Sequence, residues 1–69
     1  MVNTDKLLGI MAEQHKSQDD VAKALNMSRK TFYLRMKKKV FGSDEIEGMI
    51  KYLDISDPMP IFFAEEVTL

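Results

Sequence analysis

The sequence predicts a small all-α domain of four to five short helices. Apolar side chains recur three and four residues apart, which is the spacing of one buried helical face. A serine or threonine precedes each of the first four such stretches and can cap the first turn of a helix. Because the chain has only 69 residues, we take residues 1–69 as one domain with a compact core.

The composition excludes several classes of protein. The chain is 45% hydrophobic and 30% charged, which is typical of globular rather than disordered proteins. It contains no cysteine, so disulfides and thiolate metal sites are excluded and a reducing compartment fits. Its apolar runs are far shorter than the ~20 residues that span a membrane, and its first residues do not form a signal peptide. We therefore expect a cytoplasmic protein with no membrane partner.

The charges are unevenly distributed, although the net charge is only -1. Residues 16–39 carry eight Lys or Arg against two Asp, a net charge of +6. Residues 40–69 carry one Lys against seven Asp or Glu, a net charge of -6. The folded protein is therefore expected to have a basic side and an acidic side.

The first helix is predicted from about residue 5 to residue 15, with Thr4 as its N-cap. Gly9 weakens this helix slightly. Four apolar residues stand at the spacing of one buried stripe, and they are Leu7, Leu8, Met11 and Ala12.

Ser17 is a good N-cap for a second helix, and Asp20 completes an acidic variant of the capping box. Asp19 and Asp20 also complement the positive end of the helix dipole. Asn26 tolerates the left-handed conformation that ends a helix. The apolar face between these ends covers barely two turns and consists of Val21, Ala22 and Leu25.

Ser28 is expected to cap a third helix that extends to about residue 38. Phe32 and Met36 are four residues apart and define its buried edge. Since only a tight turn fits between Leu25 and Ser28, the second and third helices must cross at a steep angle. Met27, inside this turn, can point back into the core.

A fourth helix is expected from about residue 44 to residue 53, after a break at Gly42 and Ser43. Its apolar stripe consists of Ile46, Met49, Ile50 and Leu53. Two prolines then forbid a long helix, and Met59 is expected to be extended because it precedes a proline. Residues 61–63 are expected to form an apolar plug, and the tail 61–69 to be partly ordered.

Residues 18–38 are therefore predicted to form a helix, a tight turn and a second helix, and they resemble the helix-turn-helix of phage repressor and Cro-like (XRE-type) DNA-binding proteins. The family has a small residue where Ala22 stands, because the two helices nearly touch there. It has apolar residues at four further positions, which here are Val21, Leu25, Met27 and Phe32. The segment "PIFFAEEVT" also resembles the ends of small phage Cro-like regulators. The resemblance implies a small lambda-repressor-like DNA-binding domain.

Two positions depart from the family pattern. Asn26 stands where the turn usually has glycine, and asparagine adopts positive φ at modest cost. Arg35 stands where an apolar residue is more common. We expect Met36 to supply the packing there, while Arg35 extends along the helix surface.

The resemblance implies that residues 28–38 are a recognition helix that lies in the major groove of DNA. Arg29 can grip guanine O6 and N7 with its planar fork, and Lys30 can reach a base or a phosphate. The side chains expected to contact DNA are Gln18, Ser28, Arg29, Lys30, Thr31, Tyr33, Leu34, Lys37 and Lys38. Further candidates for phosphate contact are Lys16, Lys23, Lys39 and the helix N-terminus near Ser43.

Simpler structural interpretations stay open for some of these residues. A run of lysines such as residues 37–39 is often only a solvated helix face. A half-buried tyrosine at this position explains Tyr33 as well as DNA contact does.

Two functions from different classes fit these observations. The first is a sequence-specific transcription regulator, such as a repressor, that binds a double-stranded DNA operator as a homodimer, because one short helix covers few base pairs. Phe62 and Phe63 are candidates for dimer contacts or for core packing. The alternative is an antirepressor, a protein-interaction module whose acidic half and apolar tail dock on a partner phage repressor in a heterodimer.

Enzyme chemistry, a cofactor and a metal site are not expected. His15 is the only histidine, and alone it forms neither a metal site nor a catalytic dyad. Glu65 and Glu66 are adjacent in the tail, which does not hold an acid–base pair in place. The three glycines are isolated and form no phosphate-binding loop.

Overall fold

The computed structural model describes residues 1–63 and places five α-helices within them. These are α1 (Thr4–Glu13), α2 (Gln18–Ala24), α3 (Arg29–Lys38), α4 (Ser43–Tyr52) and α5 (Met59–Phe62). The described residues contain no β-strand, and the expected all-α fold is confirmed.

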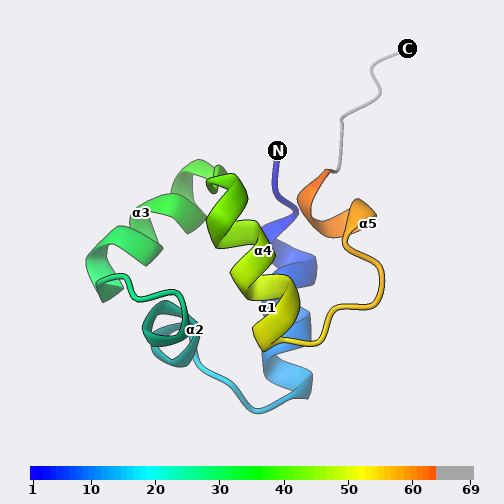
Figure 1. The fold of residues 1–69 in the computed structure, drawn as a ribbon, viewed down its shortest axis with the longest axis horizontal. Coiled ribbons are helices and arrows are strands. Elements are labelled where there is room, and N and C mark those ends of the chain that lie inside the picture. The colour runs from blue at the N-terminus through cyan, green and yellow to red at the C-terminus, as the bar shows by residue number, and fades with distance from the viewer. Residues whose placement is uncertain (64–69) are drawn as a thin grey trace.

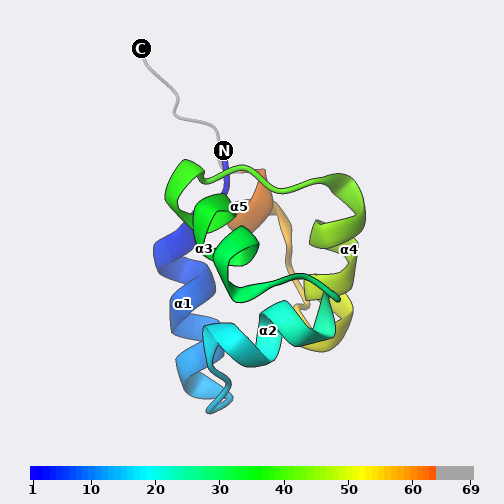
Figure 2. The same cartoon turned by 90° about the vertical axis from the view of Figure 1, so that its left-hand side faces the viewer.

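The helices surround one core from all sides. α1 and α4 lie on opposite sides of it, α2 and α3 close one end, and α5 closes the other (Figures 1 and 2). The N-terminal segment runs between the end of α3 and α5. The Val2 N–H donates to the Lys39 carbonyl at 3.0 Å, and the Asn3 N–H donates to the Ile61 carbonyl at 2.6 Å. The first residues therefore link the end of α3 to α5.

Every helix contributes to the buried apolar core. The rings of Phe32 and Phe41 pack at a tilt, with centroids 5.6 Å apart. Ile46 is half-buried and packs against this cluster, as do Leu25 and Met27. The buried side chains are Val2, Leu7, Met11, Val21, Ala22, Phe32, Met36, Phe41, Met49, Leu53, Ile61 and Phe62.

The first helix differs from the prediction at both ends and in its buried face. Its N-cap is Asn3 rather than Thr4, because the Asn3 side chain accepts the Lys6 N–H at 3.1 Å. It ends at Glu13 rather than residue 15, since His15 adopts a φ of 56°. The predicted stripe was also partly wrong: Leu8 and Ala12 are exposed, and the buried members are Leu7 and Met11.

The predicted capping of α2 and α3 is confirmed. The Ser17 hydroxyl accepts the Asp20 N–H at 3.1 Å, and the Asp20 carboxylate accepts the Ser17 N–H at 2.8 Å. The backbone hydrogen bond from Ser17 is the main cause that lowers the pKa of Asp20. The Ser28 hydroxyl accepts the Thr31 N–H at 3.1 Å and caps α3.

Four helices end in the same way, at a non-glycine residue in the left-handed conformation. In each case the following N–H reaches back to a carbonyl in the last turn, as from Met27 to Ala22 and from Ile55 to Ile50, both at 3.0 Å. The chain can therefore turn sharply after each helix without using a glycine. The left-handed residues are His15, Asn26, Lys39 and Asp54.

The C-terminal half starts and ends differently from the prediction. α4 begins at Ser43, and its N-cap is Gly42, whose N–H donates to the Glu45 carboxylate at 2.8 Å. The extended conformation expected for Met59 is wrong, because Met59 is the first residue of α5. Pro60 follows at the second helical position, where a helix does not need its N–H.

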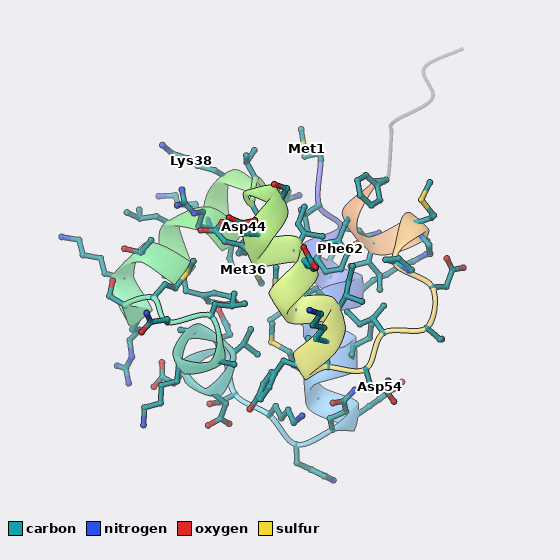
Figure 3. All side chains as sticks on the ribbon, viewed as in Figure 1. Met1, Met36, Lys38, Asp44, Asp54 and Phe62 are labelled. Atoms are coloured by element: carbon teal, nitrogen blue, oxygen red, sulfur yellow. The ribbon has the colours of Figure 1, made fainter. Side chains whose placement is uncertain are left out.

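The predicted apolar plug divides into two parts. Ile61 and Phe62 are buried in the core, whereas Phe63 is 52% exposed. Figure 3 shows Phe62 among the side chains between α5 and the rest of the molecule. The rest of the predicted tail, residues 64–69 with Glu65 and Glu66, lies outside the described residues.

Candidate nucleic-acid interface

α3 has one buried face and one exposed face. Phe32 and Met36 are 1% and 8% exposed and fix the inward side of the helix. With about 3.6 residues per turn, the opposite side carries residues 30, 34, 37 and 38, all of which are exposed. We call the exposed residues of α3 other than Arg35 the α3 surface, which comprises Arg29, Lys30, Tyr33, Leu34, Lys37 and Lys38.

The α3 surface combines cations with large apolar side chains. Tyr33 is 63% exposed and Leu34 is 46% exposed, although both have apolar bodies. Tyr33 is therefore exposed rather than half-buried, and the half-buried interpretation of its position is wrong. Lysines at positions 30 and 37 stand one turn before and one turn after this pair.

The connection between α2 and α3 places this surface at the edge of the molecule. Ala22 is only 2% exposed, and its carbonyl accepts the Met27 N–H at 3.0 Å. α2 is viewed nearly along its axis in Figure 1, whereas α3 runs across the view, so the two helices cross steeply. In Figure 2 α3 lies on the viewer's side of the molecule, with no other helix in front of it.

Arg29 at the start of α3 is paired with Asp19 in the first turn of α2. The Arg29 Nε donates to Asp19 Oδ1 at 2.7 Å, and Nη2 donates to Asp19 Oδ2. The side chains are 80% and 45% exposed, so the pair lies on the surface. The hydrogen bonds to Asp19, and then its charge, raise the pKa of Arg29, which stays a cation.

Ser28 and Thr31 use their hydroxyls within the first turn of α3. The Ser28 hydroxyl accepts the Thr31 N–H and donates to Thr31 Oγ1 at 2.9 Å. Ser28 is exposed and Thr31 is half-buried. These two predicted contact residues therefore also form the cap of α3.

Gln18 lies beside the α3 surface although it belongs to another helix. A shallow depression on the surface is lined by Gln18, Asp19, Arg29, Phe32 and Tyr33. A neighbouring depression joins Gln18 and Tyr33 to Lys37 and to residues of α1. The structure therefore brings Gln18, Arg29 and Tyr33 together along the α2 side of α3.

Two cations of the basic segment are held elsewhere. The Arg35 Nε lies 3.1 Å from Glu45 Oε1, so this side chain turns toward α4 instead of extending along α3. The Lys16 Nζ donates to the Tyr52 carbonyl at 3.1 Å and lies 4.1 Å from the centre of the Tyr52 ring. Lys16 thus binds the C-terminal end of α4, where a cation is favoured. Lys23 and Lys39 are exposed.

Acidic side chains gather on α4 and the segment after it. Figure 3 shows Lys38 extending from the end of α3 and Asp54 at the far end of α4. Glu47 is exposed and lies 3.7 Å from Lys51. The exposed acidic residues of this part are Asp44, Glu47, Asp54 and Asp57.

Sequence reasoning did not find the partners of the two arginines. Asp19 precedes Arg29 by ten residues, and Arg35 precedes Glu45 by ten. No helical spacing joins positions so far apart, and only the crossing of α2, α3 and α4 brings them together. The acidic start of α2 was a weak indication of such a partner, but the capping box and the helix dipole already explain acidic residues there.

Comparisons with family models, with curated proteins and with solved structures found no match for this chain. Of the helices in residues 1–63, none has the length and apolar character that crossing a membrane requires. The candidate interface therefore rests on the residues and geometry given above.

Proposed function

We propose that the protein is a sequence-specific DNA-binding regulator of transcription, of the small phage Cro-like type, in which α2 and α3 form a helix-turn-helix. In this proposal α3 lies in the major groove, with the side chains of its N-terminal half against base edges. The observation that carries the proposal is the α3 surface, where four cations surround two exposed side chains with apolar bodies.

The chemistry of the α3 surface suits a groove bordered by phosphates. Arg29 and Lys30 stand at the start of the helix, where a recognition helix reaches base edges. Lys37 and Lys38 stand at its end and can reach the phosphate backbone. A merely solvated face does not need Leu34 and Tyr33 between its cations, whereas a thymine methyl provides an apolar contact for them.

The proposed protein binds its operator as a dimer. One recognition helix contacts too few base pairs for high specificity, and two copies related by a two-fold axis contact two half-sites. Such half-sites lie about 34–36 Å apart, which is one turn of DNA. We therefore expect the preferred sequence to be a palindrome.

A binding experiment on selected DNA tests this proposal. Duplexes are first selected from a randomised pool, and fluorescence anisotropy then measures affinity at several salt concentrations. We expect a preferred sequence and an affinity that falls steeply with salt, because bound phosphates release their counterions. Lys37→Ala should weaken binding to all duplexes and lower the salt slope by about one.

Lys51→Ala is the matched control for Lys37→Ala. Lys51 is an exposed lysine on α4, next to Glu47 on the acidic side. Its removal should leave DNA binding unchanged. The proposal is wrong if the protein selects no sequence, or if Lys37→Ala and Lys51→Ala bind DNA as the unmodified protein does.

A second candidate function is an antirepressor that pairs with a phage repressor. The observation that favours it is the exposed acidic set on α4 and after it, which complements a basic DNA-binding domain. In that case the protein alone binds no duplex in the assay above. It instead forms a stable complex with a phage repressor in size-exclusion chromatography, and charge removal at Asp44 and Glu47 weakens that complex.

A further inference from the structure

We propose that Asp19 is a positioning residue that presents Arg29 to a guanine and so sets base preference at one position of the operator. This inference rests on the proposed DNA-binding function and adds a residue that does not itself contact a base. Its basis is the two-point contact between the Arg29 guanidinium and the Asp19 carboxylate across the α2–α3 crossing.

The contact with Asp19 leaves the Arg29 donors that can bind guanine free. Asp19 occupies Nε and one N–H of Nη2, so the second N–H of Nη2 and both of Nη1 have no partner in this contact. Two of these donors point in parallel from the far edge of the group. That is the arrangement that matches the O6 and N7 acceptors of guanine.

The contact with Asp19 also reduces the conformational entropy that Arg29 loses when the protein binds DNA. An exposed arginine has many rotamers, and fixing them on binding opposes association. Asp19 holds Arg29 in one orientation before DNA arrives, although the arginine side chain is 80% exposed. The hydrogen bonds between Ser17 and Asp20 fix the turn of α2 from which Asp19 extends.

Asp19 should have opposite effects on specific and non-specific binding. A carboxylate next to the DNA surface repels phosphates and lowers affinity for every sequence. Its contribution is then to specificity, by orienting one cation and by opposing unselective binding. A residue that only stabilised the fold would change both kinds of binding in the same direction.

Arg35 provides the internal comparison. It too is an α3 arginine paired with a carboxylate of another helix, but its partner Glu45 is only 19% exposed and also accepts the Gly42 N–H. This pair joins α3 to the first turn of α4. Arg35 is therefore expected to be structural, with no influence on base preference.

The test compares the sequences that variants select from a randomised duplex pool. For Arg29→Ala and Asp19→Ala we expect the same guanine to lose its preference, by about tenfold, while other positions are retained. Affinity for an unrelated duplex should rise in Asp19→Ala and fall in Arg29→Ala. Arg35→Ala should keep the guanine.

The outcomes separate the two proposals. The proposed role of Asp19 is wrong if Asp19→Ala keeps the guanine preference, or if Arg29→Ala loses base preference at no position of the operator. The DNA-binding proposal stands in either case. If the unmodified protein selects no sequence, both proposals fail. Thermal unfolding by circular dichroism reports whether each variant folds, and Asp19→Asn, which keeps the size of the side chain, decides by the same criteria if Asp19→Ala does not fold.

Discussion

At the scale of the residue, two of the three glycines do not stand where helix geometry favours them. Gly9 and Gly48 lie inside α1 and α4, while four non-glycine residues occupy the left-handed positions at helix ends. A glycine inside a helix costs stability, and a side chain in the left-handed conformation costs about 1–2 kcal/mol. Of the four left-handed residues, sequence reasoning anticipated only Asn26, because asparagine is a known helix end.

The two helical glycines are predicted to respond differently to alanine. A Cβ at Gly9 meets nothing within 4 Å, so Gly9→Ala should raise the free energy of unfolding by about 1 kcal/mol. A Cβ at Gly48 would lie 2.6 Å from Leu25 Cδ2, so Gly48→Ala should gain less than Gly9→Ala or lose stability. Urea unfolding measures both, and equal gains would contradict the packing at Leu25.

The capping carboxylate of α2 makes a pH-dependent contribution to stability. Asp20 accepts hydrogen bonds from Ser17 as a carboxylate, so its folded-state pKa lies below the usual 3.8. A lowered folded pKa gives a contribution that is complete above the unfolded pKa and is lost as pH falls through the folded pKa. The stabilising effect of Asp20 is therefore expected at neutral pH and not in strong acid.

Asp20→Asn tests this pH dependence by urea unfolding over a pH series. The difference in unfolding free energy between the unmodified protein and Asp20→Asn should be largest at neutral pH and shrink below pH 3.8. Other carboxylates titrate in both proteins and cancel in the difference. A difference that stays constant with pH would contradict the role of the charged cap.

At the scale of the element, local patterns predicted where helices occur better than where they end. Serine caps at residues 17 and 28 were found from sequence, because a cap bonds within its own turn. The end of α1 and the short α5 were missed. The left-handed residue at a helix end is usually glycine and sometimes asparagine, so His15 gave no signal of the end of α1. Met59 joins a helix because α5 packs its apolar residues against the core.

The close contact of α2 with α3 is predicted to be intolerant of added volume. Ala22 is 2% exposed at the α2–α3 crossing, so Ala22→Leu should lower the free energy of unfolding by about 1–3 kcal/mol as overpacking. Ala24→Leu is the matched control, because Ala24 is exposed on the same helix. Equal stability of the two variants in urea would show that the crossing has room for a larger side chain.

At the scale of the whole molecule, the distribution of charge matters more than its sum. The net charge of -1 gives no attraction to DNA, and any binding depends on the cations of the α3 surface being gathered on one helix. Acidic residues lie on α4 and after it. The division of charge visible along the chain thus corresponds to different helices in the fold.

Reversing one charge at two places separates local charge from net charge. Lys37→Glu and Lys51→Glu change the net charge of the protein equally. Lys37→Glu should abolish measurable DNA binding in anisotropy, whereas Lys51→Glu should weaken it only slightly and only at low salt, since distant charges are screened. Similar losses in both variants would mean that net charge, and not the α3 surface, controls association.

The sequence by itself determined the all-α class, the caps of α2 and α3, the buried edge of α3 and the segregation of charge. These features depend on residues within a few positions of one another, where helical periodicity and hydrogen bonding are local. Only the tertiary structure decided that Lys16 binds the end of α4, that Arg35 turns to Glu45 and that Asp19 holds Arg29. Those contacts join different helices, and their geometry follows from how the core makes the helices cross.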